Sequence, residues 1–261
     1  MNTPKYLEGG RTNKIIRTED CVHRPTGPWT NQVHKFLNHL RKNGFYSAPE
    51  PVGFDDKGLE IVSFIKGEVS NYPLSPNASS SKALLSAARL LRKFHDASQS
   101  FLADNTSEQW QLPARDPQEV ICHGDFAPYN VVLEGEQAIG IIDFDTCHPG
   151  PRTWDIAYAL YRWSPFTNPD NRDGFGTIED QISRARLFCQ AYGLSNEQRI
   201  GLASLIIERL GVLINFLLAQ AEKGNKDFEL HRQDGHHLLY LADVEYIKDH
   251  LIKIEDGLGN P

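Results

Sequence analysis

The octapeptide "HGDFAPYN" at 123–130 constrains this chain more than any other feature of its sequence. It places a histidine, an aspartate and an asparagine within eight residues, and its glycine and proline argue against a regular helix or strand. Apolar runs follow it closely, and "IIDFD" at 141–145 brings a further aspartate, Asp143, to the end of a Val- and Ile-rich hairpin pattern. We interpret 123–130 as a polar loop held against a core, where catalytic groups are often displayed.

The joint spacing of these motifs indicates phosphoryl transfer from a nucleotide. That reaction needs a group that accepts the proton of the attacking hydroxyl, and hard oxygen ligands for Mg²⁺ on the phosphates. In protein kinases the loop aspartate is the base, and the asparagine and a later aspartate hold the metal. Turn formers and caps would explain a lone His-x-Asp. Loop, hairpin and aspartate in this order, however, place Asp125, Asn130 and Asp143 around one point.

The hydrophobic pattern divides the chain into a β-rich first part and a helical remainder. Two short β-like runs flank a turn in 13–25, apolar residues at helical spacing follow, and 59–65 is typical of a further strand. We predict an α+β, two-lobed fold, in which a small β-rich lobe with one helix (1–65) precedes a larger, mostly helical lobe (66–261). The larger lobe carries the catalytic β-hairpin and four helical patterns, near 154–163, 178–192, 196–223 and 233–255.

The composition argues against several kinds of partner. The formal net charge of −7 is unlike that of proteins that bind nucleic-acid backbones. The four cysteines form no Cys-x-x-Cys pair, which is typical of reduced thiols in the cytosol. The first residues lack the apolar core of a signal peptide, and Glu208 and Arg209 interrupt the longest apolar stretch, which we interpret as a buried helix. We expect a cytoplasmic protein with no nucleic-acid or membrane partner. No oligomeric state is predicted.

The two motifs together resemble the aminoglycoside phosphotransferase and choline kinase-like family, small-molecule phosphotransferases with a protein-kinase-like fold. Members typically carry glycine where protein kinases have arginine after the histidine, as Gly124 does here. The resemblance extends to "RPTGPWTNQVHKFLNHLRKNGF", "APEPVGFDDKGLEIVSFIKGE", "LLRKFHD" and "IDFDTCHPGPRTWDIAYALY", which are similar to a bacterial subgroup. It covers nearly the whole chain to about residue 195 and is looser beyond it.

This resemblance implies roles for individual residues of the larger lobe. Asp125 would be the catalytic base or hydroxyl-orienting residue, and Asn130 and Asp143 would hold Mg²⁺. Three further residues would support this centre: His123 through hydrogen bonds to the loop, Asp155 by tying the region down, and Asp145 as a second acidic group that faces the metal or the loop.

The resemblance also implies a site for ATP (or GTP) in the first lobe. Arg24 matches the cation on the third strand that holds the phosphates, and arginine can clamp a phosphate with two hydrogen bonds. The helix glutamate that usually orients this cation is missing, because no acidic residue lies between Cys21 and Pro49. Gln32 or His34 could orient Arg24 instead.

Two short segments complete the expected nucleotide site. Gly9 and Gly10 could belong to a phosphate-binding loop, and a tight hairpin explains this glycine pair equally well. The backbone of Phe64 and Ile65, after the strand "IVSF", is expected to meet the adenine.

The sequence therefore predicts a kinase that transfers the γ-phosphoryl group of ATP (or GTP) to a hydroxyl of an aminoglycoside-like, amino-alcohol or sugar acceptor. The alternative is a nucleotide- or ligand-binding pseudokinase without transfer activity. The missing helix glutamate favours that alternative, and the complete set of Asp125, Asn130 and Asp143 argues against it. His95 is expected to cap or pack a helix. The acidic loop 167–180 could receive a cationic substrate, but it is more typical of a solvated loop.

Overall fold

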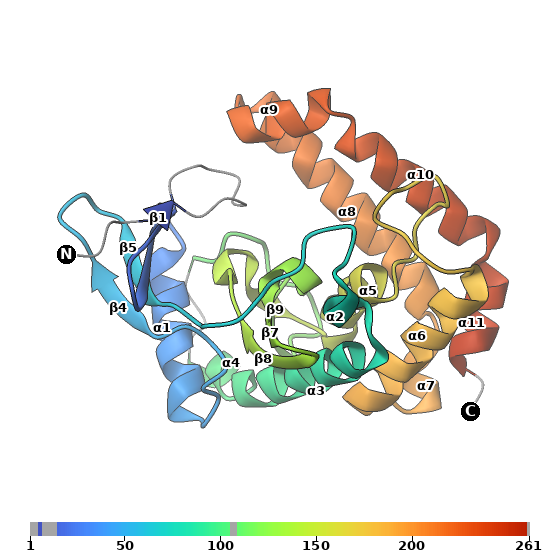
Figure 1. Ribbon diagram of the computed structural model, residues 1–261, viewed down its shortest axis with the longest axis horizontal. Coiled ribbons are helices and arrows are strands. Elements are labelled where there is room, and N and C mark those ends of the chain that lie inside the picture. The colour runs from blue at the N-terminus through green and yellow to red at the C-terminus, as the bar shows by residue number, and fades with distance from the viewer. Residues whose placement is uncertain (1–4, 7–14, 105–108, 260–261) are drawn as a thin grey trace.

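The computed structural model describes residues 5–6, 15–104 and 109–259. A small sheet with one long helix lies at one end of the molecule, and helices make up most of the other end (Figure 1). Two short β-ladders lie between them, and these carry the predicted catalytic loop and hairpin. This is the predicted arrangement of a β-rich part followed by a helical part.

The first sheet is antiparallel, with strand order β1-β2-β3-β5-β4. Its strands are β1 (Lys5–Tyr6), β2 (Ile16–Arg17), β3 (Cys21–Arg24), β4 (Pro51–Phe54) and β5 (Glu60–Ser63). The predicted turn after β2 and the predicted strand in 59–65 are both present. Helix α1 (Thr30–Lys42) buries the predicted apolar face, which consists of Val33, Phe36, Leu37 and Leu40. The ring of Phe36 packs against that of Phe94 in the larger lobe.

The connection between the two parts is bonded to the catalytic hairpin. Glu68 exchanges two backbone hydrogen bonds with Leu133, at 2.9 and 2.7 Å, and the amide of Ser70 donates to the carbonyl of Pro128. The segment after β5 therefore runs along the hairpin that carries Asp143 at its end.

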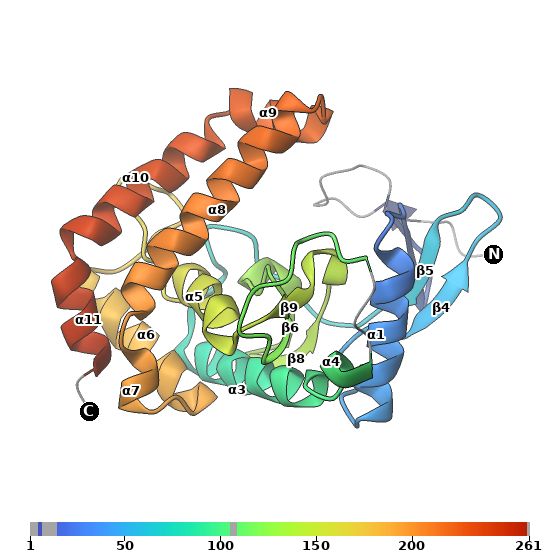
Figure 2. The ribbon, with the colours of Figure 1, turned by 180° about the vertical axis from the view of Figure 1, so that it is seen from behind.

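The catalytic hairpin consists of β7 (Val131–Glu134) and β8 (Gln137–Ile141), with Val131 opposite Ile141. A second ladder pairs β6 (Val120–Cys122) with β9 (His148–Gly150). The loop 123–130 therefore begins at the end of one ladder and leads into the first strand of the other. Helix α3 (Ser81–Ser98) lies against the hairpin and buries an apolar stripe there (Figures 1 and 2). Serine side chains cap α3 and the short α2 (Pro76–Ser79).

The remaining helices complete the larger lobe. They are α4 (Phe101–Asp104), α5 (Arg152–Trp163), α6 (Ile178–Tyr192), α7 (Asn196–Arg199), α8 (Leu202–Glu222), α9 (Lys226–Gln233), α10 (His236–Asp249) and α11 (Leu251–Gly259). A capping box joins Ser195 and Gln198 at the start of α7. The expectation of one helix over 196–223 is wrong in detail, because Gly201 adopts φ 83° and separates α7 from α8.

The predicted helix over 233–255 is also divided. Gly235 adopts φ 76° between α9 and α10, and α10 ends at Asp249 before α11 begins. Helices α8 and α10 run side by side away from the hairpin, and α9 joins their far ends (Figures 1 and 2).

One described stretch, Asn196–Glu222, is long and apolar enough to cross a membrane by length and composition alone, and 39% of its most apolar window is buried. Helix α8 contacts α5, α9, α10 and α11, and its residues Leu202, Ile206 and Leu210 are fully or almost fully buried. A core helix of a folded lobe meets the same criteria.

Candidate active site

The loop after β6 is held by one buried carboxylate of α5. Asp155 accepts the amide hydrogens of His123 (2.7 Å) and Gly124 (2.9 Å), and its side chain is fully buried. Asp155 therefore bonds to the two residues that precede Asp125. This matches the supporting position that the sequence assigns to it.

Gly124 is required by the conformation of this loop. Its φ is +81°, and a Cβ at this position would lie 2.5 Å from the carbonyl oxygen of Thr146. The carbonyl of Gly124 accepts a 2.6 Å hydrogen bond from the buried Arg209 of α8. Backbone on one side and a helix on the other leave no room for a side chain.

His123 joins the loop to the end of the hairpin. Its Nε2 lies 3.0 Å from the carbonyl oxygen of Ile142, and its Nδ1 lies 3.3 Å from the amide of Asp125. Nε2 therefore carries the hydrogen and Nδ1 accepts. The amide of Ile142 donates to the carbonyl of Asn130 (2.9 Å). These bonds bring Asp125, Asn130 and the residue before Asp143 together.

Both carboxylate oxygens of Asp125 have a donor. Asn130 Nδ2 donates to Oδ2 at 2.9 Å, and Tyr129 Oη donates to Oδ1 at 2.7 Å. Because the amide nitrogen of Asn130 points at Asp125, its amide oxygen is the group left to bind a metal. The Tyr129 contact is absent from the sequence prediction, which treats this residue as loop.

Asp143 follows the hairpin in a left-handed conformation. Its φ and ψ are 64° and 69°, and it is the one non-glycine residue with positive φ in the part of the chain that the structure describes. Such strain is common at functional sites. The carboxylate is half exposed, and its Oδ1 accepts a 2.8 Å hydrogen bond from Arg24 Nη1.

Arg24 pairs with three carboxylates. Besides Asp143, it donates from Nη2 to Asp145 Oδ1 at 2.8 Å, and its Nε lies 2.6 Å from Glu60 Oε1. Glu60 is 1% exposed and sits directly opposite Arg24 in the pairing of β3 with β5. The counter-charge that the sequence lacks on the helix therefore comes from a strand.

The expected substitutes on α1 do not contact Arg24. His34 Nε2 lies 2.9 Å from Glu60 Oε2, so the helix reaches the arginine through the glutamate. Gln32 is buried, and its side-chain amide makes no hydrogen bond to the described residues. Glu60 could have been identified from the sequence by pairing the two predicted strands, because an antiparallel β3–β5 ladder places it beside Arg24.

The charges of this cluster shift its pKa values. Burial and the neighbouring Asp143 and Glu60 raise the pKa of Asp145 to about 6, against the attraction of Arg24. Burial opposes the charge of Arg24, but Asp145, Asp143 and Glu60 outweigh it and raise the pKa of the guanidinium. Arg24 is therefore charged, and Asp145 can take up a proton in mildly acidic solution.

His95 belongs to the support of the loop, beyond the packing role expected for it. Its Nε2 lies 3.0 Å from Asp155 Oδ2 and its Nδ1 lies 2.7 Å from Tyr192 Oη, all within the core. Burial lowers the pKa of His95, so the ring is neutral and donates Nε2–H to the carboxylate. Burial opposes ionisation of Asp155 too, yet the hydrogen bond from the His95 ring and the one from the backbone amide of His123 lower the pKa of Asp155 to about 2.

The structure describes only some of the other residues that the sequence assigns to nucleotide binding. Gly9 and Gly10 lie outside the described residues. The amide of Phe64 donates to the carbonyl of Asp20 at 2.8 Å, so it is already engaged, and the Phe64 ring stacks on Arg17. Contact of the adenine with the Phe64–Ile65 backbone stays a prediction.

The donor set suits a divalent cation held jointly with phosphates. Asn130 and Asp143 offer an amide oxygen and a carboxylate, and Mg²⁺ in nucleotide enzymes usually takes one or two carboxylates plus phosphate oxygens. Among the described residues no group of three or more His, Cys, Asp and Glu side chains forms a complete cage. The residues present therefore fit Mg²⁺ bound together with a nucleotide.

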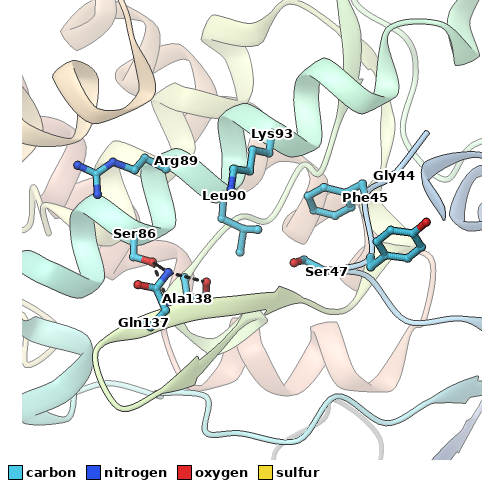
Figure 3. A pocket seen from close by; sticks show the side chains of 10 residues that line it. Gly44, Phe45, Ser47, Ser86, Arg89, Leu90, Lys93, Gln137 and Ala138 are labelled. Atoms are coloured by element: carbon cyan, nitrogen blue, oxygen red, sulfur yellow. Dashed lines mark hydrogen bonds between the residues drawn. The ribbon is translucent and has the colours of Figure 1, made fainter. Parts of the chain in front are cut away.

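A cavity of about 300 Å³ lies elsewhere, between the end of α1, helix α3 and strand β8 (Figure 3). Phe45, Leu90 and Lys93 line one part of it, and Ser86 and Gln137, which are hydrogen-bonded to each other, line another. No predicted site residue borders this cavity.

Comparison with known proteins defines the class. Residues 102–188 match the model of the phosphotransferase enzyme family. The trifolitoxin immunity protein of Rhizobium leguminosarum bv. trifolii is 33% identical over 214 residues, which are 79% of this chain and 80% of that protein.

Solved structures agree in fold. A choline/ethanolamine kinase family protein from Mesorhizobium loti has a TM-score of 0.61 at 16% identity, over 98% of this chain and 93% of that one. The spectinomycin phosphotransferase APH(9)-Ia, solved with ADP and spectinomycin, has a TM-score of 0.57 at 15% identity, over 98% and 92%.

The fold and the comparisons define a phosphotransferase-family protein of protein-kinase-like fold. The chain belongs to the phosphotransferase enzyme family and is a relative of the trifolitoxin immunity protein within it. The predicted family, fold class and enzyme class are confirmed.

Proposed function

We propose that this protein is a small-molecule kinase that transfers the γ-phosphoryl group of ATP (or GTP) to a hydroxyl of an aminoglycoside-like, amino-alcohol or sugar acceptor. The observation that carries the proposal is the set of bonds around Ile142. Its carbonyl accepts from His123, its amide donates to the carbonyl of Asn130, and Asp143 follows it, so these bonds tie together the segments that carry the proposed base and the two proposed metal ligands.

Each residue then has one task. Asp125 Oδ2 is oriented by Asn130, and the Asp125 carboxylate accepts the proton of the acceptor hydroxyl as its oxygen attacks the γ-phosphorus. Asn130 and Asp143 would hold Mg²⁺, which when bound offsets the charge of the phosphates. Arg24, oriented by Glu60, would face the phosphates as a second cation.

The comparisons support an acceptor of small size, and the proposed range covers the acceptors that they name. One structural relative is a choline/ethanolamine kinase family protein, and another was solved with spectinomycin. One relative in sequence is an immunity protein, so modification of a toxin-like molecule is within the same proposal. A cytoplasmic location stays a prediction.

The test is Asp125→Ala. We expect the variant to lose phosphoryl transfer, measured as ADP release in the presence of an acceptor panel, while ADP·Mg²⁺ still raises its melting temperature as in the wild type. A variant with wild-type turnover would show that Asp125 is not the base. Wild-type protein that neither binds ADP·Mg²⁺ nor hydrolyses ATP would overturn the proposed function as a whole.

A ligand-binding pseudokinase is the second candidate, and two contacts favour it. Tyr129 Oη donates a hydrogen bond to Asp125 Oδ1, and Arg24 donates one to Asp143. Both carboxylates that transfer would use therefore already have partners within the chain. Slow ATP hydrolysis separates the two candidates, because it requires the same metal and base but no acceptor. Nucleotide binding without any hydrolysis would favour the pseudokinase.

A further inference from the structure

A buried arginine lies next to the catalytic loop inside a group of tyrosine rings. Arg162, near the end of α5, is 6% exposed. Its guanidinium carbon lies 4.1 Å from the ring centre of Tyr72, 5.3 Å from that of Tyr161 and 5.5 Å from that of Tyr129. We call these three rings and Tyr158 the tyrosine cage.

The tyrosine cage shares a wall with the catalytic base. Tyr129 donates to Asp125 Oδ1, and its hydroxyl lies 3.0 Å from that of Tyr158. A single ring therefore separates Arg162 from the loop that holds Asp125.

Aromatic cages of this kind commonly receive ammonium groups, because the faces of the rings attract a cation. Here the chain fills the cage with its own guanidinium. Four tyrosines surround that charge, and a second buried arginine, Arg209, lies 4.7 Å from the ring centre of Tyr158. A cationic group of the acceptor would meet like charge at this position.

Arg162 lacks a good carboxylate partner. The one acid within ion-pair distance among the described residues is Asp173, whose Oδ2 lies 3.5 Å from Nη2, at the limit of a hydrogen bond. The buried Nε of Arg162 makes no hydrogen bond to the described chain. A buried guanidinium with an unpaired N–H is costly and favours an added anion.

The other nearby acid is committed elsewhere. Asp243 Oδ1 accepts the amide of Asn168, and its Oδ2 accepts from Tyr161 Oη and Asn171 Nδ2. Asp243 therefore anchors the loop that bears Asp173. Asp173 is 37% exposed, so the acid that contacts Arg162 is itself open to solvent.

We propose that the acceptor carries a carboxylate near its reacting hydroxyl and that Arg162 binds this carboxylate in place of Asp173. The inference rests on the proposed function, and among the proposed amino-alcohol and sugar acceptors it selects those that also carry a carboxylate. Planar arginine pairs with carboxylates through two hydrogen bonds, which gives it both strength and orientation. Tyr129 of the tyrosine cage contacts both the guanidinium and Asp125.

The experiment compares acceptors that differ only by the carboxylate. L-Serine is tested against ethanolamine, L-homoserine against 3-aminopropanol, and choline is added as a cation with no acid. ADP release gives kcat/KM, and thermal shift with ADP·Mg²⁺ reports binding for compounds that are not turned over. We expect the carboxylate member of at least one pair to exceed its partner by about 10-fold or more in kcat/KM or affinity.

Two variants should move this preference in opposite directions. Arg162→Gln should remove it, leaving the two members of a pair within about 3-fold of each other. Asp173→Asn removes the competing acid from an exposed loop and should bind the carboxylate compound about 3-fold or more tightly than the wild type. Arg172→Gln, an exposed change on the same loop, is the matched control and should leave the preference unchanged.

The outcomes separate this inference from the proposed function. ATP hydrolysis or ADP·Mg²⁺ binding with no preference for carboxylate compounds, by turnover or by thermal shift, overturns the inference alone. A preference that survives in Arg162→Gln, or is unaffected by Asp173→Asn, also overturns it. Should Arg162→Gln fail to fold, the Asp173→Asn result decides. Absence of both hydrolysis and nucleotide binding counts against the proposed function itself.

Discussion

Arg24 and Glu60 face each other across β3 and β5, with Arg24 Nε 2.6 Å from Glu60 Oε1. His34 of α1 contacts the other oxygen of the same glutamate at 2.9 Å. Helix, strand and arginine are therefore joined through one carboxylate that is almost completely buried. In other kinases a helix glutamate contacts the cation directly, whereas here the helix contributes a histidine one step removed.

The first prediction concerns Glu60→Gln, which keeps the shape of the side chain and removes its charge. Without Glu60, Arg24 should pair more strongly with Asp143 and Asp145 and compete with a metal for Asp143. We expect ADP·Mg²⁺ to bind about 10-fold more weakly, measured by isothermal titration calorimetry, and the free energy of unfolding to fall by about 3 kcal/mol, as on breaking a buried ion pair.

Glu50→Gln is the control for this change. Glu50 is half exposed and pairs with the equally exposed Arg41 at 3.1 Å. Its loss should change stability by less than about 1 kcal/mol and leave nucleotide binding as it is. Equal effects of the two variants would mean that Glu60 does not position Arg24.

The sequence predicts most of this centre because its motifs are local. "HGDFAPYN" and "IIDFD" are recognisable in the sequence itself, and the Val and Ile runs between them predict the hairpin. The positions of Asp125, Asn130 and Asp143 in the fold can therefore be predicted with little tertiary information. The helices near 154–163 and 178–192 are likewise set by periodicity. The breaks at Gly201 and Gly235 were missed because a single glycine inside an apolar pattern is compatible with an unbroken helix.

The missed residues act across long separations in the chain. Glu60 contacts Arg24 because their strands pair, and His95 of α3 hydrogen-bonds to Asp155 of α5. The tyrosine rings around Arg162 likewise come from several elements. The local sequence does not distinguish these residues from solvent-exposed ones, because a strand glutamate or a helix arginine is usually solvated. Their roles depend on packing that residue spacing does not specify.

The second prediction is that Asp143→Asn abolishes metal-dependent nucleotide binding. Asparagine tolerates the left-handed conformation that Asp143 adopts, so the fold should persist, but it lacks the charge that attracts Mg²⁺. We expect the rise in melting temperature with ADP·Mg²⁺ to shrink to the value seen with ADP and a chelator. Asp56→Asn, in the exposed turn before β5, should behave as the wild type.

The third prediction compares two glycines. Gly124 and Gly58 have nearly the same φ, +81° and +79°, but a Cβ at Gly124 would lie 2.5 Å from Thr146 O, whereas at Gly58 it would meet nothing within 4 Å. Gly58→Ala should cost about 1 kcal/mol through backbone strain alone. Gly124→Ala should cost at least about 3 kcal/mol in urea unfolding, because the clashing atom is backbone. Equal costs would show that the loop can move away.

The fourth prediction follows from the low pKa of Asp155, about 2 in the folded protein against an ordinary 3.8. An acid whose pKa falls on folding stabilises the fold above its unfolded pKa, and this stabilisation is lost as the pH drops through the folded value. We expect Asp155 to contribute about 2 kcal/mol above pH 4 and to lose it progressively between about pH 4 and pH 2.

Urea unfolding at a series of pH values measures this contribution. Asp155→Asn should be less stable at neutral pH, because a neutral amide cannot replace the carboxylate that accepts from His95 and the two loop amides, and its acid slope should be shallower than that of the wild type. Asp56→Asn, a change at an exposed position, should keep the wild-type slope. An Asp155→Asn curve that stays parallel to the wild type down to about pH 2 would place the acid sensitivity in other carboxylates. The charge of Asp155 would then not be what holds the catalytic loop.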